Sequence, residues 1–354
     1  MRQFLKGNDA VVRGAIAAGC KAYFGYPITP ASEIAEQASL LIPQSGGIFV
    51  PAESEIGAIQ MLFGAAAAGV RGMTASSGPG ISLMQEGISY MAGASLPGVI
   101  VDIMRAGPGL GNLGVEQGDY HLVVRGGGHG CYRTPVFAPN SVQEMCDLTI
   151  HAFEVADRYR NPVYVLADGA LGQMMEPVEV PVLTSSEPEK SWAVIGNAAT
   201  RGNLITSIYL EHEKQEVLIT DLEKKYEEME KRELLWQEIQ TEDAELLIVA
   251  YGISSRIARA AVEVARAEGV RVGLFRPISL YPFPGARLRK LAGKACSVMV
   301  LELSSGQLIE DVRLSLGGIT PVQLLRRTGG MMPTTEDVAQ AIKKMEKECV
   351  GNYA

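Results

Sequence analysis

Side chains able to bind or activate a substrate follow each of the β-rich runs in the first third of the chain. They are Thr29 after the run 22–28, Glu53 and Glu55 after 48–50, Ser76 and Ser77 after 72–75, and Arg105 after 99–104. If these runs form a parallel sheet, their carboxyl ends share one edge, which is where ligands bind in open α/β sheets. A threonine hydroxyl beside an arginine suits a carboxylate, and a glutamate suits proton transfer.

The same residues also have a purely structural interpretation. Thr29-Pro30 is typical of a helix start, with threonine as the N-cap and proline at the first helical position. Arg105 would then form only a surface ion pair. Glu55 opens an apolar helix, where a carboxylate commonly stabilises the helix dipole. Two hypotheses therefore stay open: a carboxylate-binding pair with a proton-transferring glutamate, or caps and ion pairs alone.

The glycine-rich segment 107–130 matches no common phosphate-binding loop. Residues 125–130 (RGGGHG) lack the P-loop spacing, and Gly107-x-Gly109-x-Gly111 lacks the dinucleotide-binding spacing. His121 and His129 have no paired carboxylate spacing, so we interpret them as loop or interface residues. Glycine in this segment allows a left-handed backbone and close approach to a ligand or a partner.

Alternating β-rich and helical patterns predict an α/β fold with two doubly wound, mostly parallel sheets. The first pattern has strands at 22–28, 48–50, 72–75, 99–104, 135–138 and 163–167. Asn8 and Ser141 are the predicted N-caps of two of its helices. The second pattern starts at Leu246, with strands at 246–250, 270–275, 298–301 and 322–325.

Residues 211–245 differ from the rest of the chain in charge. They hold 13 acidic and 5 basic side chains, a net charge of −8 that equals the net charge of the whole chain. Apolar residues at helical spacing predict one long amphipathic helix there: Ile219, Leu222, Tyr226, Met229 and Trp236. We therefore expect a first domain over 1–185, a linker with an acidic helix over 186–245, and a second domain over 246–354.

Composition excludes several classes of protein. The net charge of −8 argues against a nucleic-acid binder and a polybasic membrane-surface protein. No apolar run reaches the roughly 18 residues that a membrane span needs, and no secretory signal is visible, so we expect a cytoplasmic protein. The five cysteines form no C-x-x-C pair, which argues against an iron–sulfur cluster or structural zinc. Their odd number fits a reducing compartment.

Several longer motifs occur in order along the chain. They are Tyr26-Pro27-Ile28-Thr29-Pro30 with Ser32, Ser54-Glu55-Ile56-Gly57-Ala58, residues 74–80 (TASSGPG), Met104-Arg105, residues 141–144 (SVQE), 250–252 (AYG) and 276–282 (RPISLYP). Together they resemble the α subunit of the 2-oxoacid:ferredoxin oxidoreductases over nearly the whole chain. The resemblance implies a pyrimidine-binding domain for thiamine diphosphate over 1–185 and a transketolase C-terminal-like domain over 246–354.

The resemblance implies an enzyme that converts a 2-oxoacid and coenzyme A to acyl-CoA and CO2 and passes the electrons to ferredoxin. By motif match, Glu55 would contact N1′ of the aminopyrimidine, and Ser77 and Gly78 would belong to the cofactor site. Thr29 and Arg105 would hold the substrate carboxylate. The sequence does not decide whether Glu53 or Glu55 faces the pyrimidine.

Two parts that this reaction needs are missing from the sequence. Related enzymes hold Mg²⁺ and the diphosphate with Gly-Asp-Gly and a later Asn, and only Gly118-Asp119-Tyr120 and Ala167-Asp168-Gly169 come near that motif. No cysteine cluster is present for electron transfer. The resemblance therefore implies a hetero-oligomer. A β subunit would hold Mg²⁺ and diphosphate, a ferredoxin-like subunit would hold 4Fe–4S clusters, and a γ subunit often completes the set.

The substrate is less well defined by the sequence. The compact length resembles α subunits for branched-chain (3-methyl-2-oxobutanoate) or 2-oxoglutarate oxidation, and we favour the first. A 2-oxoglutarate enzyme needs a second cation for the distal carboxylate, and Arg125 and Arg133 are candidates. The competing class is a non-catalytic transketolase-like scaffold subunit. It would predict an inert replacement at Thr29, Glu55 or Arg105, and all three are present.

Overall fold

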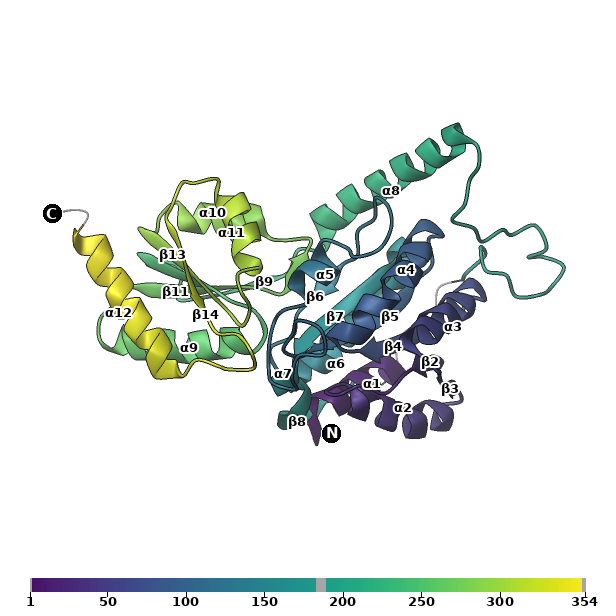
Figure 1. Cartoon of the computed structure of the whole chain (residues 1–354), viewed down its shortest axis with the longest axis horizontal. Coiled ribbons are helices and arrows are strands. Elements are labelled where there is room, and N and C mark those ends of the chain that lie inside the picture. The colour runs from purple at the N-terminus through teal and green to yellow at the C-terminus, as the bar shows by residue number, and fades with distance from the viewer. Residues whose placement is uncertain (1, 183–188, 352–354) are drawn as a thin grey trace.

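The computed structural model describes residues 2–182 and 189–351, which form two α/β units side by side (Figure 1). The large unit is built on a seven-stranded sheet in the order β12-β6-β7-β5-β4-β2-β3. Its strands are β2 (Ala22–Gly25), β3 (Ile48–Pro51), β4 (Gly72–Ser76), β5 (Gly98–Met104), β6 (Val136–Phe137), β7 (Pro162–Asp168) and β12 (Ser279–Tyr281). Neighbours from β6 to β3 run parallel, whereas β12 comes from the C-terminal half and pairs with β6 antiparallel.

Helices cover both faces of this sheet. They are α1 (Gly7–Ala17), α2 (Ser32–Gln44), α3 (Glu55–Ala67), α4 (Gly78–Gly93), α5 (Tyr120–Val124), α6 (Val142–Tyr159) and α7 (Gly169–Gln173). On β5, Ile100 and Met104 pack in the core beneath α3 and α4, whereas Val101 and Ile103 pack in the core beneath α1, α2 and α6. Burial on both faces explains why the run 98–104 is almost continuously apolar.

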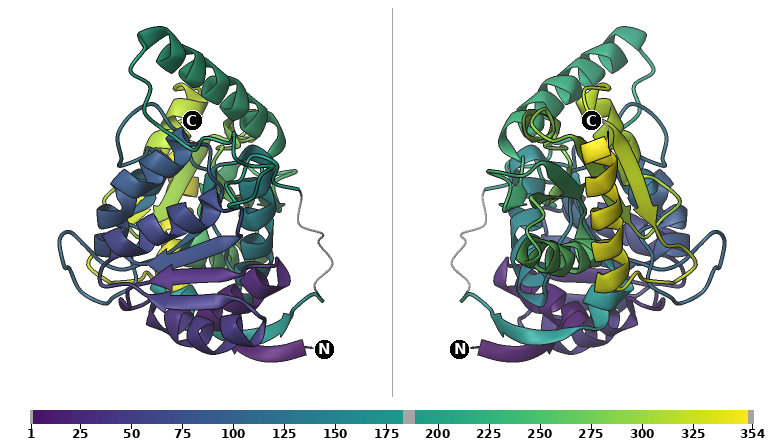
Figure 2. Two further views of the ribbon diagram at one scale, coloured as in Figure 1. Left: turned by 90° about the vertical axis from the view of Figure 1, so that its right-hand side faces the viewer. Right: turned by 90° about the vertical axis from the view of Figure 1, so that its left-hand side faces the viewer.

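The small unit has a five-stranded sheet in the order β14-β13-β10-β11-β9. Its strands are β9 (Trp236–Ile239), β10 (Leu246–Val249), β11 (Val272–Pro277), β13 (Ser297–Glu302) and β14 (Val322–Arg326), and only β9 is antiparallel to its neighbour. The helices α9 (Gly252–Ala267) and α12 (Thr335–Gly351) pack together on one face (Figure 2). The helices α10 (Gly285–Ala292) and α11 (Leu308–Leu316) contribute Leu288 and Val312 to the core shared with the large unit.

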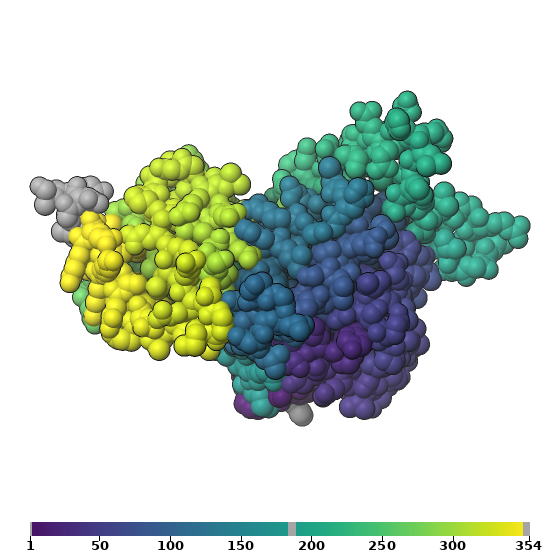
Figure 3. All heavy atoms as spheres, in the orientation of Figure 1, coloured from purple at the N-terminus to yellow at the C-terminus, as the bar shows by residue number. Residues whose placement is uncertain are grey.

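Two further elements complete the described chain. β1 (Arg2–Lys6) and β8 (Met175–Glu179) pair as an antiparallel ribbon. The long helix α8 (His212–Arg232) leads back toward the small unit and buries Leu222, Tyr226 and Met229 against the large one. The segment 189–211 before it packs on the large unit through Trp192 and Ala193, and its remaining part projects from the body of the molecule at the right of Figure 3. None of the described helices is long and apolar enough to cross a membrane.

The predicted fold class of two mostly parallel α/β sheets is confirmed, and the acidic helix is corrected. That helix ends at Arg232, and Trp236 belongs to β9, where it pairs with Pro277. The helix stops because Glu233 turns into a buried cluster, in which it accepts hydrogen bonds from Arg158 and Tyr159. The predicted domain boundary at residue 185 lies outside the described residues.

Two predicted helix caps are also wrong. Asn8 lies inside α1, where its side-chain amide donates to the Pro30 carbonyl (2.8 Å) and to Glu33 (3.0 Å). Thr29-Pro30 precedes α2 without opening it: the Ala31 N–H donates to the Ile28 carbonyl, so residues 28–31 form a turn before the helix. The predicted cap Ser141 is confirmed, because its hydroxyl accepts the Glu144 N–H.

Two of the five cysteines are bonded to each other, a pairing that the sequence analysis did not predict. Cys296, just before β13, and Cys349, near the end of α12, form a disulfide. Cys131 and Cys146 are free. The bonded pair is 53 residues apart in sequence, so no spacing motif indicated it.

Candidate active site

The predicted site residues share one edge of the large sheet. β5, β4, β2 and β3 are consecutive parallel neighbours, so their carboxyl ends point the same way. Arg105 follows β5, Ser77 follows β4, Thr29 lies beyond β2, and Glu55 lies beyond β3. The edge that the sequence predicted therefore exists in the fold.

The sequence does not decide between Glu53 and Glu55 as the site residue. In the structure Glu55 is the buried one of the two. It is the first residue of α3, and only 5% of it is exposed. Its carboxylate lies against α4, because a Cβ at Gly80 would be 2.5 Å from its Oε1 and 2.0 Å from the Ser76 Oγ. Glu53 is exposed and folds over Gly57 on the outside of the helix start. The geometry therefore places Glu55, and not Glu53, inside the site.

Arg105 and Thr29 are brought together through the backbone. The Arg105 Nη1 donates to the Thr29 carbonyl (3.0 Å), and Nη2 donates to the Leu110 carbonyl (3.0 Å). The Arg105 Nε is buried and has no partner among the residues that the structure describes. The guanidinium is therefore fixed in place and keeps donor capacity for an anion, while Thr29 itself is exposed beside it.

Buried polar atoms without protein partners cluster around the start of α4. Within the described ranges, the unpaired oxygens include the hydroxyls of Ser76 and Ser77, both carboxylate oxygens of Asp102 and one of Asp119. Gly78 opens α4 against Asp119, and a Cβ there would lie 2.9 Å from each Asp119 oxygen. Buried polar groups in proteins are normally hydrogen-bonded, so this cluster fits a polar ligand.

A cavity of about 970 Å³ lies between the two units next to this cluster. The large unit contributes Gly78, Arg105, the loop 106–110, Glu116 and Asp119, and the small unit contributes Ser304, Gln307 and Gly329, among others. Glu116 joins the two walls by accepting the N–H groups of Gly107 (2.7 Å) and Gly329 (2.9 Å). Thr29, Glu55 and Ser77 lie outside the residues that line this cavity.

Two buried carboxylates of the site, Asp102 and Asp119, have raised pKa values. Burial, followed by the nearby charge of Glu116, raises the pKa of Asp119 to about 7, and Arg105 acts in the opposite direction. Burial and Asp119 raise the pKa of Asp102 well above its ordinary value. The sequence analysis missed both carboxylates as functional candidates. Their signal was weak: Asp119 is an acidic residue inside the glycine-rich segment.

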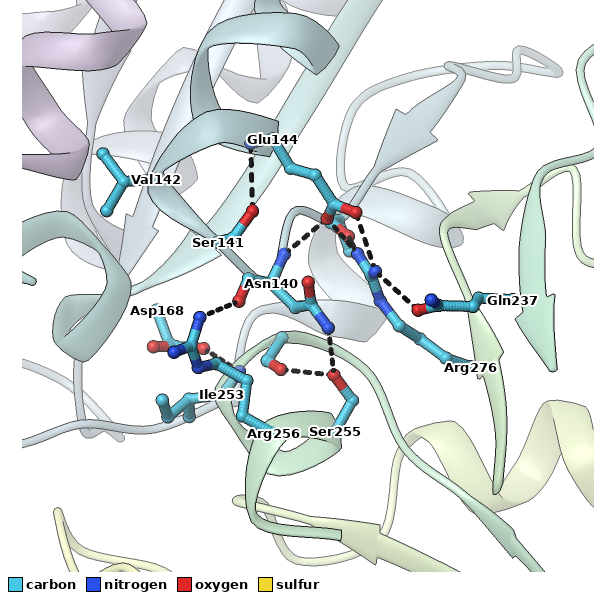
Figure 4. Close-up of polar contacts among 12 residues, drawn as sticks. Asn140, Ser141, Val142, Glu144, Asp168, Gln237, Ile253, Ser255, Arg256 and Arg276 are labelled. Atoms are coloured by element: carbon cyan, nitrogen blue, oxygen red, sulfur yellow. Dashed lines mark hydrogen bonds and ion pairs between the residues drawn. The ribbon is translucent and has the colours of Figure 1, made fainter. Parts of the chain in front are cut away.

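A polar clamp fixes the small unit on the large one (Figure 4). The carboxylate of Asp168 accepts N–H groups from Leu171 in the large unit (3.1 Å) and Ile253 at the start of α9 (2.9 Å). Arg276, 1% exposed, donates to both oxygens of Glu144 at the start of α6. These contacts set the relative position of the two walls of the cavity.

The two arginines considered for binding the distal carboxylate of 2-oxoglutarate lie outside the cavity. Arg125 donates to Asp311 of α11 (2.8 Å), and Arg133 lies over the ring of Tyr281, 5.8 Å from its centre. Neither arginine lines the cavity beside Arg105. Across residues 2–182 and 189–351, no group of three or more His, Cys, Asp or Glu side chains is placed to hold a metal ion.

Comparison with known protein families identifies the family of this chain. Residues 13–239 match the family described as pyruvate flavodoxin/ferredoxin oxidoreductase, thiamine diphosphate-binding, and residues 244–338 match pyruvate:ferredoxin oxidoreductase core domain II. The chain belongs to the 2-oxoacid:ferredoxin oxidoreductase family. Its large unit with α8 is thus a thiamine diphosphate-binding domain of that family.

Individual oxidoreductases of this family are similar over almost the full chain. The ketoisovalerate oxidoreductase subunit VorB of Methanothermobacter thermautotrophicus is 57% identical over 97% of both chains. The 2-oxoglutarate synthase subunit KorA of the same organism is 37% identical, covering 97% of this chain and 99% of that protein. The solved structure of the 2-oxoglutarate:ferredoxin oxidoreductase from Magnetococcus marinus superposes with a TM-score of 0.88 at 26% identity, covering 97% of this chain and 65% of that one.

The residues present fit the pyrimidine end of thiamine diphosphate. Glu55 supplies a buried carboxylate, and the unpaired Ser76 hydroxyl lies near the same Cβ position of Gly80 as that carboxylate. Gly80 keeps the approach to Glu55 free of a side chain, because any Cβ there would meet the carboxylate.

Proposed function

We propose that this chain is the α subunit of a thiamine-diphosphate-dependent oxidoreductase that converts 3-methyl-2-oxobutanoate and coenzyme A to the acyl-CoA and CO2, with ferredoxin as the electron acceptor. The observation that carries the proposal is the fixed Arg105 guanidinium at the same sheet edge as the buried Glu55. When bound, thiamine diphosphate supplies the carbanion for addition to the keto carbon and the electron sink for loss of CO2.

In this proposal each residue has a defined task. Glu55 would hold a proton against N1′ of the bound pyrimidine, as a buried acid–base group. Arg105 binds the substrate carboxylate with its remaining donors, and the Thr29 hydroxyl adds one more. Ser77 and Gly78 form the cofactor wall at the start of α4. Because Arg105 is held by two carbonyls, it orients the carboxylate without having to be ordered by substrate.

The choice of a branched substrate is supported by the relatives and by the arginines. The similarity to a subunit named for ketoisovalerate is much higher, 57% against 37%, than to one named for 2-oxoglutarate. In addition, the two candidates for binding a distal carboxylate, Arg125 and Arg133, are engaged with Asp311 and Tyr281. A 2-oxoglutarate oxidoreductase is the second candidate substrate assignment.

The chain is proposed to act within a complex. The similar proteins are themselves named as subunits. We infer that a β subunit brings Mg²⁺ and the diphosphate site, that a ferredoxin-like subunit brings 4Fe–4S clusters, and that a γ subunit is also present. The projecting segment supports assembly, because Leu204, Ile208 and Leu210 are 79%, 72% and 88% exposed there. We also propose the domain limits 1–185, 186–245 and 246–354 for this subunit.

The test is acyl-CoA formation by the co-purified complex with a panel of 2-oxoacids. We expect the highest kcat/KM for 3-methyl-2-oxobutanoate and little turnover of 2-oxoglutarate. Highest activity with 2-oxoglutarate would replace the substrate assignment. A complex that holds all its subunits and cofactors but turns over none of the 2-oxoacids would favour the non-catalytic scaffold.

A further inference from the structure

Asp119 is a carboxylate at the site to which the proposed function gives no task. It directly precedes α5, yet no capping hydrogen bond to its side chain is formed in that described helix. Its carboxylate instead lies against Gly78 at the start of α4 and lines the cavity together with Arg105. One of its oxygens is buried without a partner among the described residues. Helix capping therefore does not explain why a carboxylate is kept here.

Asp102 lies close to Asp119, inside the sheet. It sits near the end of β5, opposite Ser76 in the β4–β5 register, and it is completely buried. Its two oxygens lack hydrogen-bond partners in the described part of the chain. Burial and the nearby charge of Asp119 both raise the pKa of Asp102 well above its ordinary value. Asp119, with a pKa raised to about 7, is then about half ionised at pH 7.

The groups that face Asp119 come from several elements. Arg105 after β5 lowers its pKa, whereas Glu116 in the preceding loop raises it. Burial raises the pKa of Asp102 on β5, and it also raises the pKa of the buried phenols Tyr164 on β7 and Tyr251 before α9 well above the ordinary value. Glu116 is fixed by two N–H groups. The group in this set whose charge a bound anion would cancel is thus Arg105.

We propose that Asp119 is a proton-holding residue of the substrate site, which binds a proton when a 2-oxoacid carboxylate occupies Arg105 and releases it when that carboxylate leaves as CO2. The inference rests on the proposed function, which places the carboxylate at Arg105. The bound anion cancels the positive charge that favours ionised Asp119 and adds a negative charge to a cavity that already contains Glu116. Ionised Asp119 therefore takes a proton from solvent as the substrate binds.

The proton returns in the decarboxylation step. The bond between the keto carbon and the carboxylate breaks, the electron pair stays with the reacting carbon, and CO2 leaves as a neutral molecule. Arg105 is then free of its anion and again favours ionised Asp119, which releases its proton to solvent. Asp119 acts on the substrate through Arg105, so it is a positioning residue. Its protonation lets the cavity accept an anion without placing three carboxylates around one guanidinium.

The experiment measures proton uptake on ligand binding to the intact complex. The probe is 2-hydroxy-3-methylbutanoate, which carries the carboxylate but has no keto carbon to react. Calorimetric titrations in buffers of different ionisation enthalpy give the number of protons bound. We expect uptake of up to one proton per bound probe, increasing from pH 6 to pH 8, because Asp119, whose pKa burial raises to about 7, is ionised in a growing fraction of molecules over this range.

Variants assign the proton to a residue. Asp119→Asn should abolish the uptake, and Asp119→Glu should retain it with a shifted pH dependence. Asp147→Asn is the matched control, because Asp147 is an exposed carboxylate on α6 far from the cavity lining, and the uptake should be unchanged.

Each result decides for or against the proposal. Uptake below 0.1 proton from pH 6 to 8.5 in the wild-type complex, with the probe bound, overturns it without any variant. Undiminished uptake in Asp119→Asn also overturns it, because the proton then resides elsewhere. In both cases the wild-type complex still turns over 2-oxoacids, so the proposed function stands while this inference fails. If neither probe binding nor turnover is found, the proposed function itself fails and this inference fails with it.

Discussion

Arg105→Lys tests the carboxylate-binding role most sharply, because it keeps the charge and removes the geometry. The guanidinium already donates to the carbonyls of Thr29 and Leu110, each at 3.0 Å, and still has further N–H groups for a substrate. A lysine ammonium has three donors at a single point, so it cannot hold both carbonyls and also meet a planar carboxylate with two parallel bonds. Losing one charge-assisted hydrogen bond costs about 1.5–3 kcal/mol. We therefore expect kcat/KM to fall by about 10- to 150-fold.

The assay is kcat/KM for 3-methyl-2-oxobutanoate in the complete complex. Thr29→Val retains the backbone carbonyl that Arg105 contacts and removes only the hydroxyl, so its loss should be smaller. If both residues hold one carboxylate, the double variant should lose less transition-state free energy than the sum of the single losses. Arg133→Lys is the matched control, because Arg133 lies over Tyr281 and does not line the cavity. A change of less than twofold in Arg105→Lys refutes the carboxylate-binding role, and strict additivity separates the two residues.

Three further substitutions probe the site and its support. Glu55→Gln should slow C2 proton exchange by about 10²–10⁴-fold in an assembled complex, and a near-normal exchange rate would remove Glu55 from the mechanism. Gly80→Ala should weaken thiamine diphosphate binding, since its Cβ would meet the Glu55 carboxylate, whereas Gly64→Ala in α3, where a Cβ meets nothing within 4 Å, should stabilise the fold by up to about 1 kcal/mol. Asp168→Asn should lower the free energy of unfolding by about 1–3 kcal/mol, because an amide cannot accept both N–H groups. Burial raises the pKa of Asp168 to about 6, so native protein binds the proton more tightly than unfolded protein. Between about pH 4 and pH 6, chemical denaturation should show wild-type stability falling relative to Asp168→Asn as pH rises.

The sheet edge could be predicted from the sequence because the central strands are buried on both faces. An apolar run such as 98–104 is recognisable without its neighbours, and the residue after it must lie at a strand end. The edge position of Arg105 follows from this alone. The same reasoning places Ser77, which follows the adjacent strand β4, and Glu55, which follows β3 on the far side of β4 and β2.

The sequence was less informative where tertiary contacts override a local preference. Trp236 continues the apolar spacing of α8, but pairing with β11 makes it part of a strand. Thr29-Pro30 has the composition of a helix start, yet the chain makes a turn there before α2 begins at Ser32. A local pattern describes what a segment prefers in isolation, and strand pairing with a distant segment decides the outcome.

The acidic residues of the cavity were even harder to predict from the sequence. Glu116 and Asp119 are ordinary surface-type residues in a glycine-rich segment, and nothing in their spacing indicates burial. Their environment forms only when the small unit closes over the loop, through contacts such as Glu116 with Gly329, which is 213 residues away in the sequence. The raised pKa of Asp119 is a consequence of that closure, because burial is its largest cause. Substitutions that loosen the clamp between the units, such as Asp168→Asn, should therefore also move the protonation of Asp119 toward that of an ordinary aspartate.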